Sequence, residues 1–208
     1  MTAKLKYCIK RVCFLIVFLM FGWSLTAQPI YWNEGRYYSA NFSYSHKMLN
    51  MGQFDVFGVE FSTYPSPTMG WEMASSIEFG KDYFSFEPIS LVGSLFVFVT
   101  QFGDFDAKFR FAAMLLAVTA GKVPIYPLNW MEIVPYWNLM KCTIIKSKFS
   151  NMQIYGDIGL SLRFFPLESF LDWYDTFFIS PFAEYDFGYE KNSPFKGFGF
   201  GVKVGMFF

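Results

Sequence analysis

The last thirteen residues, KGFGFGVKVGMFF, constrain the fold more than any other stretch of the chain. From Phe198 to Phe208 every second residue is large and apolar, whereas the positions between them up to Gly205 hold glycine or Lys203. A β-strand places successive side chains on opposite faces, so this segment predicts a strand with one apolar face and one small or polar face. Such a strand suits a sheet whose outer face meets lipid and whose inner face lines a filled or wet interior.

The N-terminus predicts export. Residues 1–27 begin with a basic region that ends at Arg11, continue with an apolar run from Cys13 to Leu25, and end in a small residue, Ala27. This pattern is typical of a secretory signal peptide, and the apolar run is shorter than the roughly 20 residues that a spanning helix needs. We therefore expect residues 1–27 to be a signal peptide and 28–208 to form one domain.

Composition excludes several classes of function. Residues 28–208 hold 13 Lys and Arg against 17 Asp and Glu, so nucleic-acid binding is not expected. Cys142 is the single Cys of that segment and His46 the single His, so the sequence predicts neither a disulfide framework nor a metal site or cofactor. The 29 Phe and 13 Tyr favour strands and membrane interfaces.

The same alternation recurs along most of the chain, separated by turn residues such as Asn50, Gly52 and Pro65. We predict eight strands, at 36–48, 53–64, 69–79, from Tyr83 onward, 133–147, 152–165, 177–190 and 196–208. The fold class is therefore all-β, an antiparallel transmembrane β-barrel.

Residues 89–129 interrupt this pattern. They contain two apolar pieces, 91–102 and 109–120, and the second is rich in Ala, Leu and Met without alternation. Asp104 or Asp106 is suited to cap the second piece as a helix. We expect an apolar, helical insert on the periplasmic side, which packs within the chain or docks on a periplasmic or membrane partner. Two further strands, which would give a ten-stranded barrel, are the alternative.

The signal peptide, the alternating strands and the terminal FGFGVKVGMFF resemble the small outer-membrane β-barrels of Gram-negative bacteria, the eight-stranded OmpA/OmpX-like group. The resemblance implies a location in the outer membrane, in contact with lipid and lipopolysaccharide. It also implies that the barrel-assembly machinery reads the C-terminal strand as its signal, through Phe200, Val202, Val204, Met206 and Phe208. With Phe208 at the periplasmic end, the short turns near residues 50, 81, 150 and 192 fall outside the cell.

Alternation also predicts a charged interior. The inward-facing residues are expected to be Glu60, Glu72, Glu78, Glu132, Asp157, Arg163, Glu184, Asp186 and Lys203. Charges in so narrow a barrel must pair or be hydrated. Seven acids against two bases leave two interpretations open, a hydrogen-bonded plug or a narrow cation-preferring pore.

Ser45 and His46 are the candidates for a catalytic role, since an outer-membrane lipid-modifying enzyme needs a nucleophilic Ser, a His base and a carboxylate. Adjacent residues of a strand face opposite sides, so these two side chains cannot hydrogen-bond to each other. The sequence therefore favours a non-enzymatic protein with a structural or interaction role, with the pore and the lipid-modifying enzyme as alternatives.

Overall fold

The computed structural model describes residues 38–63, 71–100, 106, 108–109, 112, 115–116, 118–128, 130–145, 153–165, 177–190 and 192–208. The predicted signal peptide lies outside these residues. The elements, in chain order, are β1 (Tyr38–Leu49), β2 (Gly52–Thr63), β3 (Glu72–Gly80), β4 (Tyr83–Phe86), α2 (Pro88–Thr100), β5 (Ala120–Lys122), β6 (Ile125–Leu128), β7 (Met131–Ile145), β8 (Gln153–Phe164), β9 (Phe177–Gly188) and β10 (Gly197–Phe207).

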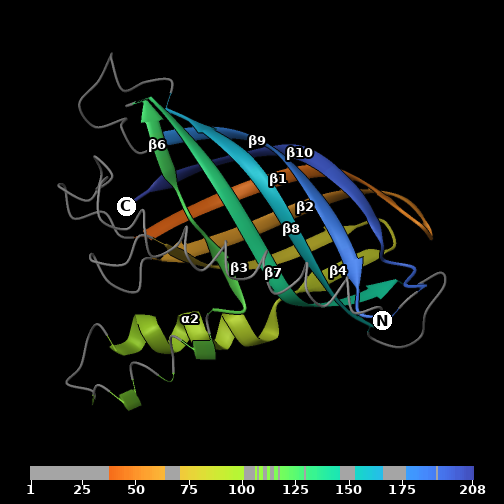
Figure 1. Cartoon of the computed structure of the whole chain (residues 1–208), viewed down its shortest axis with the longest axis horizontal. Coiled ribbons are helices and arrows are strands. Elements are labelled where there is room, and N and C mark those ends of the chain that lie inside the picture. The colour runs from red at the N-terminus through yellow and green to blue at the C-terminus, as the bar shows by residue number, and fades with distance from the viewer. Residues whose placement is uncertain are drawn as a thin grey trace, which may run out of the picture.

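The strands form one closed antiparallel sheet (Figure 1). β1 pairs with both β2 and β10, and β2–β3 pairing completes the ring. Closure pairs the strands around the ring with one another, which a membrane-spanning sheet requires so that its backbone groups are hydrogen-bonded.

Ten β segments fill only eight positions of the wall. β4 and β5 both lie between β3 and β7, β4 against Ile77–Phe79 and β5 against Glu72 and Met73. β6 then continues along β7. We call β4, β5 and β6 together the composite strand. The predicted eight-stranded barrel is therefore confirmed, and the ten-stranded alternative is wrong.

The insert has different bounds from those predicted. The chain leaves the composite strand after Phe86 and returns to it at Ala120, so residues 120–128 belong to the wall rather than to an insert over 89–129. The predicted helical character is confirmed by α2 and by helical residues between Lys108 and Leu116. Asp106 accepts a hydrogen bond from the Lys108 backbone N–H, which is the cap expected there. No helix in the described part of the chain is long and apolar enough to cross a membrane.

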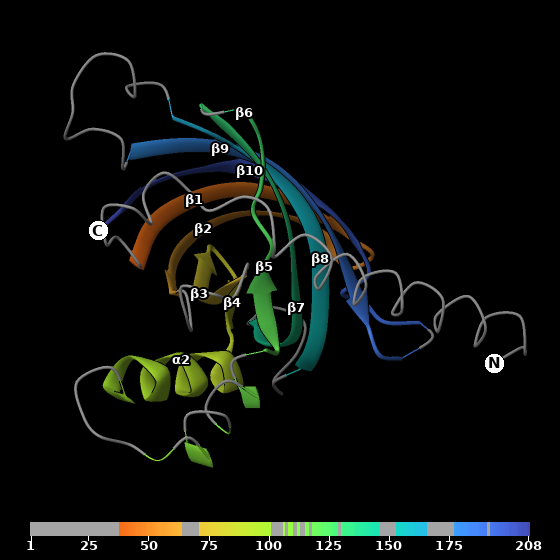
Figure 2. The same cartoon turned by 60° about the vertical axis from the view of Figure 1, so that its left-hand side comes forward.

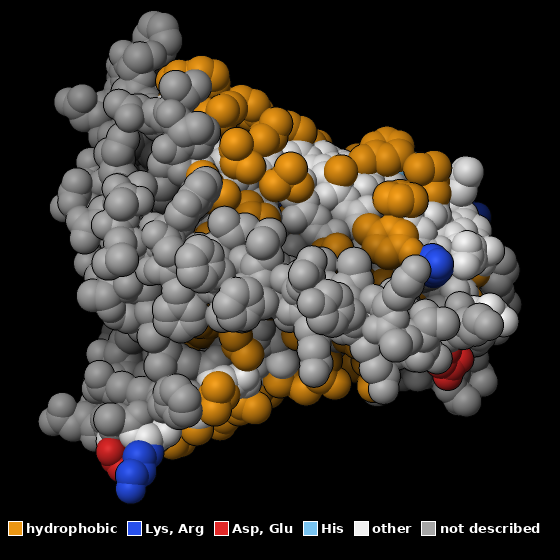
Figure 3. All heavy atoms as spheres, in the orientation of Figure 1, with side chains coloured by type: hydrophobic (Ala, Val, Ile, Leu, Met, Phe, Trp, Pro, Cys, Tyr) orange, Lys and Arg blue, Asp and Glu red, His pale blue; other side chains and the backbone are white. Residues whose placement is uncertain are grey.

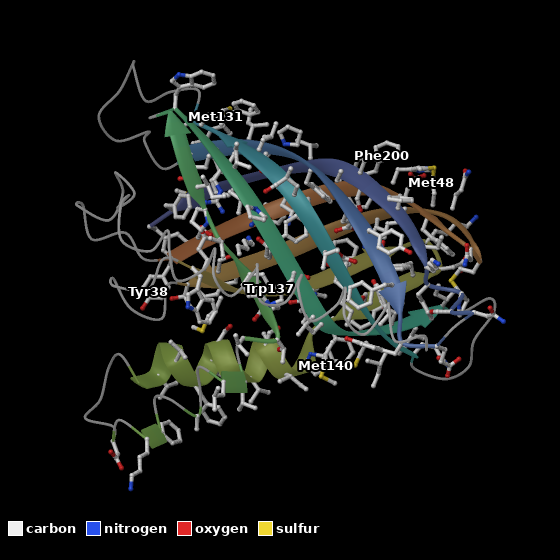
Figure 4. The ribbon with its side chains drawn as sticks, in the orientation of Figure 1. Tyr38, Met48, Met131, Trp137, Met140 and Phe200 are labelled. Carbon is white, nitrogen blue, oxygen red and sulfur yellow. The ribbon has the colours of Figure 1, made fainter. Side chains whose placement is uncertain are left out.

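The wall is apolar outside and polar inside. Outward side chains such as Phe42, Phe57, Phe198 and Phe200 are exposed, whereas Ser39, Asn41, Ser45 and other polar side chains of the same strands are buried. In Figure 3 hydrophobic side chains cover the described wall, and the coloured charged side chains lie near its two ends. Figure 4 shows Met48 and Phe200 on the outside near one end, and Tyr38 and Met131 at the other.

The two ends of the barrel differ as the sequence predicts. Tyr38 and Phe208 exchange backbone hydrogen bonds of 3.1 and 2.9 Å, so β1 begins where β10 ends. The turns at Asn50 and at Lys81–Asp82 lie at the opposite end, which we call the outer end. The end that holds Tyr38 and Phe208 is the periplasmic end of the predicted orientation.

Candidate functional site

The interior of the barrel holds every charged residue that the sequence placed there. The strands alternate as expected, so Glu60, Glu72, Glu78, Glu132, Asp157, Arg163, Glu184, Asp186 and Lys203 all project into the lumen and contact one another or other lumen side chains. Residues from β2, β3, β7, β8, β9 and β10 meet there because each strand contributes every second side chain.

Lys47 organises the part of the lumen nearest the outer end. Its side chain is fully buried, and its Nζ lies 2.6 Å from Glu184 Oε1, 3.3 Å from Asp186 Oδ1 and 3.4 Å from Glu78 Oε2. A buried ammonium of this kind is stable only while acids surround it. The ionised acids in turn need the ammonium of Lys47, because burial has removed most of the water around them.

Lys141 binds a second pair of acids beside the first. Its Nζ lies 2.8 Å from Glu78 Oε1 and 2.6 Å from Asp157 Oδ2, so Glu78 bridges two lysines. Above this layer the hydroxyls of Tyr83 and Tyr155 lie 2.5 Å apart, and Tyr83 donates to Glu78 over 3.3 Å. The charges are thus linked by hydrogen bonds to the aromatic residues at the outer end.

A third group occupies the middle of the lumen around Glu60. This carboxylate accepts hydrogen bonds from Lys122, from Lys203 at 2.9 Å and from the Asn41 amide at 2.6 Å. Lys203 also lies 4.7 Å from the ring centre of Tyr136, a cation–π distance.

Arg163 holds the periplasmic third of the lumen. Its guanidinium binds both Glu72 oxygens, at 2.9 and 3.2 Å, and Glu132 at 2.7 Å. It also lies 4.8 Å from the Phe178 ring and 4.9 Å from the Phe207 ring. The planar fork of Arg suits this bidentate and stacked arrangement, which Lys would not reproduce.

Apolar side chains close the outer end of the lumen. Strands β1, β2, β4, β7 and β8 and the β1–β2 and β9–β10 connections contribute to this cluster, which consists of Leu49, Met51, Val56, Tyr83, Ile145, Tyr155 and Phe195. Phe195 comes from the segment between β9 and β10 and stacks on Tyr155 with the ring centres 5.1 Å apart. We call this cluster the outer plug.

One small cavity lies inside the described part of the barrel. A cavity of about 30 Å³ lies in the middle of the lumen among Glu60, Glu78, Glu87, Lys122 and Lys141, which is room for water but not for a larger solute. Within the described residues, no group of three or more His, Cys, Asp and Glu side chains is placed to hold a metal ion.

The sequence missed three of the lumen bases, and this changes the charge balance. Lys47 lies on the inner face of β1 but was not counted, and Lys122 was assigned to the insert. Lys141 turns inward because β7 contains a β-bulge between Asn138 and Lys141, which reverses the alternation that the sequence suggests. The expectation of two bases against seven acids is therefore wrong, since five bases contact the lumen acids.

The glycines on the inner face of β10 leave space for side chains of β9. A Cβ at Gly199 would lie 2.8 Å from Glu184 Oε1, and one at Gly205 would lie 2.6 Å from the Phe178 ring. Side chains of β9 such as Glu184 and Phe178 therefore extend over the glycines of β10, which have no side chain in the way. This explains why small residues alternate with large ones in the terminal segment.

The composite strand is interrupted at the middle of the wall, and Glu87 spans the break. Its carboxylate accepts hydrogen bonds from the Ser76 N–H at 3.1 Å and the Ser76 hydroxyl at 2.5 Å on β3, and from the Asn138 amide on β7. Glu87 also precedes Pro88, the first residue of α2, and accepts from Ser90 Oγ at 3.2 Å. One buried side chain thus bridges β3 and β7 at the break and also contacts the first turn of α2.

α2 packs on the outside of the wall rather than at the barrel mouth. Ser75 Oγ donates to Ser94 Oγ over 3.0 Å, and Val97 packs against Met73 and Trp71. Figure 2 shows α2 beside β3 and outside the ring of strands. The insert was expected on the periplasmic side, and in the structure it leaves the wall halfway along and packs on the outside of β3.

His46 and Ser45 do not form a catalytic pair. Ser45 is buried on the inner face of β1, whereas His46 faces outward and its Nδ1 lies 2.9 Å from Asp55 Oδ1. Tyr44 donates to the same Asp55 oxygen over 3.0 Å, and the His46 ring lies 5.6 Å from that of Phe200. With these contacts, His46 lies like an aromatic residue on the outward face of the barrel wall, near its outer end.

The residues of the predicted assembly signal share the outer face of β10. Phe200, Val202, Val204, Met206 and Phe208 are all exposed there, and Phe208 stacks on Tyr38 with ring centres 6.1 Å apart. Their neighbour Phe207 points inward, where Arg163 contacts it.

Comparison with known proteins gives structural matches only. No protein-family model and no curated protein sequence matches the chain. Similar structures include the N-terminal β-barrel domain of Pseudomonas aeruginosa OprF, with a TM-score of 0.47 and 14% identity over 82% of this chain and 97% of that one. Neisserial surface protein A has a TM-score of 0.43 and 6% identity over 84% and 97% of the two chains. Yersinia pestis Ail has a TM-score of 0.43 and 12% identity over 83% and 99%.

The assignment of this chain rests on its own geometry. A closed ring of antiparallel strands, a continuous apolar exterior and a charged, hydrogen-bonded interior are together the arrangement that a lipid bilayer imposes on a β-sheet protein. The chain is a small, eight-stranded transmembrane β-barrel.

Proposed function

We propose that this protein is a non-enzymatic, non-conducting component of the outer membrane with a structural or interaction role. The outer plug is the observation that carries the proposal. Its members Leu49, Val56, Ile145 and Tyr155 come from strand ends around the barrel and are buried against one another. An apolar cluster across the outer end blocks the passage of ions, because an ion that crossed it would lose its hydration without gaining polar partners.

The ion pairs beneath the plug argue against the alternative of a cation-preferring pore. A conducting pore needs acids that remain hydrated and available to passing ions. Here Glu60, Glu78 and Glu184 each form an ion pair with a Lys within the protein, so these carboxylates are already engaged. The lumen is better suited to hold the strands in register than to conduct.

The partners proposed for the barrel contact its outside. The exposed apolar wall is suited to the acyl chains of outer-membrane lipid, and its outer rim to lipopolysaccharide. We also propose that the barrel-assembly machinery recognises the outward face of β10, from Phe200 to Phe208. The lipid-modifying enzyme is disfavoured because Ser45 and His46 face opposite sides of the wall.

Conductance of the purified protein in planar bilayers tests the proposal. We expect no current steps from folded wild-type protein, whose insertion is checked by the shift in gel mobility between unheated and boiled samples. Cation-selective steps that decrease in the Glu60→Gln, Glu184→Gln double variant would overturn the proposal and establish the pore. A general porin reconstituted in the same way serves as the positive control.

A further inference from the structure

The hairpin that leaves the barrel wall, α2 and the helical residues up to Leu116, carries apolar side chains on its exposed surface. Leu91, Val92, Leu95, Phe96 and Val99 of α2 are each at least 40% exposed. A helix exposed to water shows the opposite pattern, with charged and polar residues outward. The exposed face of α2 is therefore suited to contact lipid hydrocarbon rather than water.

The face of α2 that meets the barrel has the composition of a helix interface within a membrane. Ser90, Gly93, Ser94 and Val97 are buried and recur at the spacing of one helix face. Small residues let a helix approach its neighbour closely, and hydroxyls form hydrogen bonds between the elements, as Ser94 does with Ser75. The helix therefore buries its small and polar face and exposes its large apolar one.

The position of the exit fixes the depth of the helix. Glu87 bonds to Ser76 on β3 and Asn138 on β7, and these two residues stand at the middle of their strands. Farther along α2, Ser94 contacts Ser75 of β3, and Val97 contacts Met73 and Trp71, which lie closer to the periplasmic end. The helix therefore runs toward the periplasmic end. Figure 1 shows the same course along the wall.

The length of α2 matches one leaflet. Its 13 residues rise about 20 Å at 1.5 Å per residue, and half of a bilayer's hydrocarbon core is about 15 Å thick. The charged residues described in the hairpin, Asp106 and Lys108, come after α2 and are exposed. If α2 starts at the bilayer centre and is inclined along the wall, its far end reaches the polar interface. The charged residues Asp106 and Lys108 then lie at that interface.

The second part of the hairpin has the same character. Phe109 packs edge-on against Phe96 with ring centres 5.7 Å apart. Leu115, Leu116 and Val118 are exposed before the chain returns to the wall at Ala120. Both parts of the hairpin thus present apolar side chains outward. The exposed wall residue Ile77 pairs with Phe86, two residues before α2 begins, so the apolar surface of the wall adjoins the start of the helix.

We propose that this hairpin is an intramembrane element, with its exposed face in contact with the acyl chains of the periplasmic leaflet. The continuity of its apolar surface with the lipid-facing wall selects lipid as the occupant. The chain enters and leaves the hydrocarbon at backbone that is buried in protein, where Glu87 satisfies the Ser76 N–H. Non-helical backbone is tolerated at this depth only under such cover. The apolar surface of the barrel is thereby widened on one side.

Depth-dependent fluorescence quenching tests the proposal. The natural thiol of residues 28–208 is removed as Cys142→Ala, and an environment-sensitive fluorophore is attached to Leu95→Cys in the full-length mature protein in phosphatidylcholine vesicles. Phe42→Cys, on the exposed wall, is the lipid control, and Lys108→Cys, at the charged turn, is the aqueous control. Val99→Cys repeats the measurement at a second site, in case the first variant folds poorly.

We expect the Leu95 label to be quenched by spin labels on the acyl chains to within about twofold of the Phe42 label, since both meet the same hydrocarbon. Aqueous iodide is expected to quench the Lys108 label strongly and the Leu95 label weakly. Strong iodide quenching at Leu95 and Val99 would overturn the proposal and place the hairpin in the periplasm. Protection from both quenchers would also overturn it, because it would mean that protein, from a second copy or another partner, covers the helix.

Discussion

Lys47→Met is expected to lower the free energy of unfolding by about 3–5 kcal/mol, the usual cost of removing one partner from a buried ion pair. The Nζ atom of Lys47 lies within 3.4 Å of Glu78, Glu184 and Asp186, and its side chain is fully buried. Met keeps most of the volume of Lys but leaves acids without their counter-charge. The midpoint of urea unfolding, followed by gel mobility of unheated samples, measures the loss.

Two further variants separate charge from packing in this experiment. Lys81→Met removes a lysine from the exposed turn between β3 and β4 and is expected to leave the midpoint unchanged. Lys47→Met combined with Glu184→Gln and Asp186→Asn is expected to recover part of the loss, because the unpaired charges are removed with their partner. Equal midpoints for wild type and Lys47→Met would contradict the ion-pair description of the lumen.

Glu87→Gln is expected to lower the free energy of unfolding by about 2–4 kcal/mol, although it changes a single atom. The Glu87 carboxylate accepts hydrogen bonds from Ser76 N, Ser76 Oγ, Asn138 Nδ2 and Ser90 Oγ, and it is 4% exposed. The amide of Gln has one oxygen and offers donors where these groups need acceptors. Some of these buried donors therefore lose their partner.

Urea unfolding measures this loss too, and Glu190→Gln is the matched control. Glu190 lies just beyond β9 and is exposed, so the same substitution there is expected to have little effect. If both substitutions shift the midpoint equally, or if neither does, Glu87 does not hold the interrupted wall together.

Most of the barrel can be predicted from the sequence because lipid and lumen impose opposite requirements on alternate residues. The segment from Gly197 to Phe207 shows this most clearly, since the register with β1 and β9 repeats its alternation without a shift. The nine charged residues predicted to face the lumen, from Glu60 to Lys203, follow from the same rule.

The features that the sequence did not reveal depend on breaks in that alternation. The β-bulge before Lys141 brings this lysine into the lumen, and no residue near it identifies the extra position in advance. Ala120–Lys122 is too short to show alternation and follows an apolar helical segment, so it reads as part of the insert. Phe195 reaches the outer plug from a connection between strands, where alternation carries no information.

The wall of the barrel is interrupted at the composite strand, and α2 folds back onto the outside of β3. A disulfide between Ser75→Cys and Ser94→Cys, with Cys142 replaced by Ala, tests it most directly. The two hydroxyl oxygens are 3.0 Å apart, and a small adjustment brings two sulfurs to the bond length of about 2 Å. The pair Ser75→Cys with Lys108→Cys is the control, since Lys108 lies beyond α2 at the charged turn.

The protein is oxidised in vesicles, denatured and treated with a maleimide polymer. We expect the cysteines introduced at positions 75 and 94 to resist labelling until a reductant is added. The control pair is predicted to remain fully labelled. A folded protein in which the Ser75–Ser94 pair stays as reactive as the control would contradict the position of α2 on the wall.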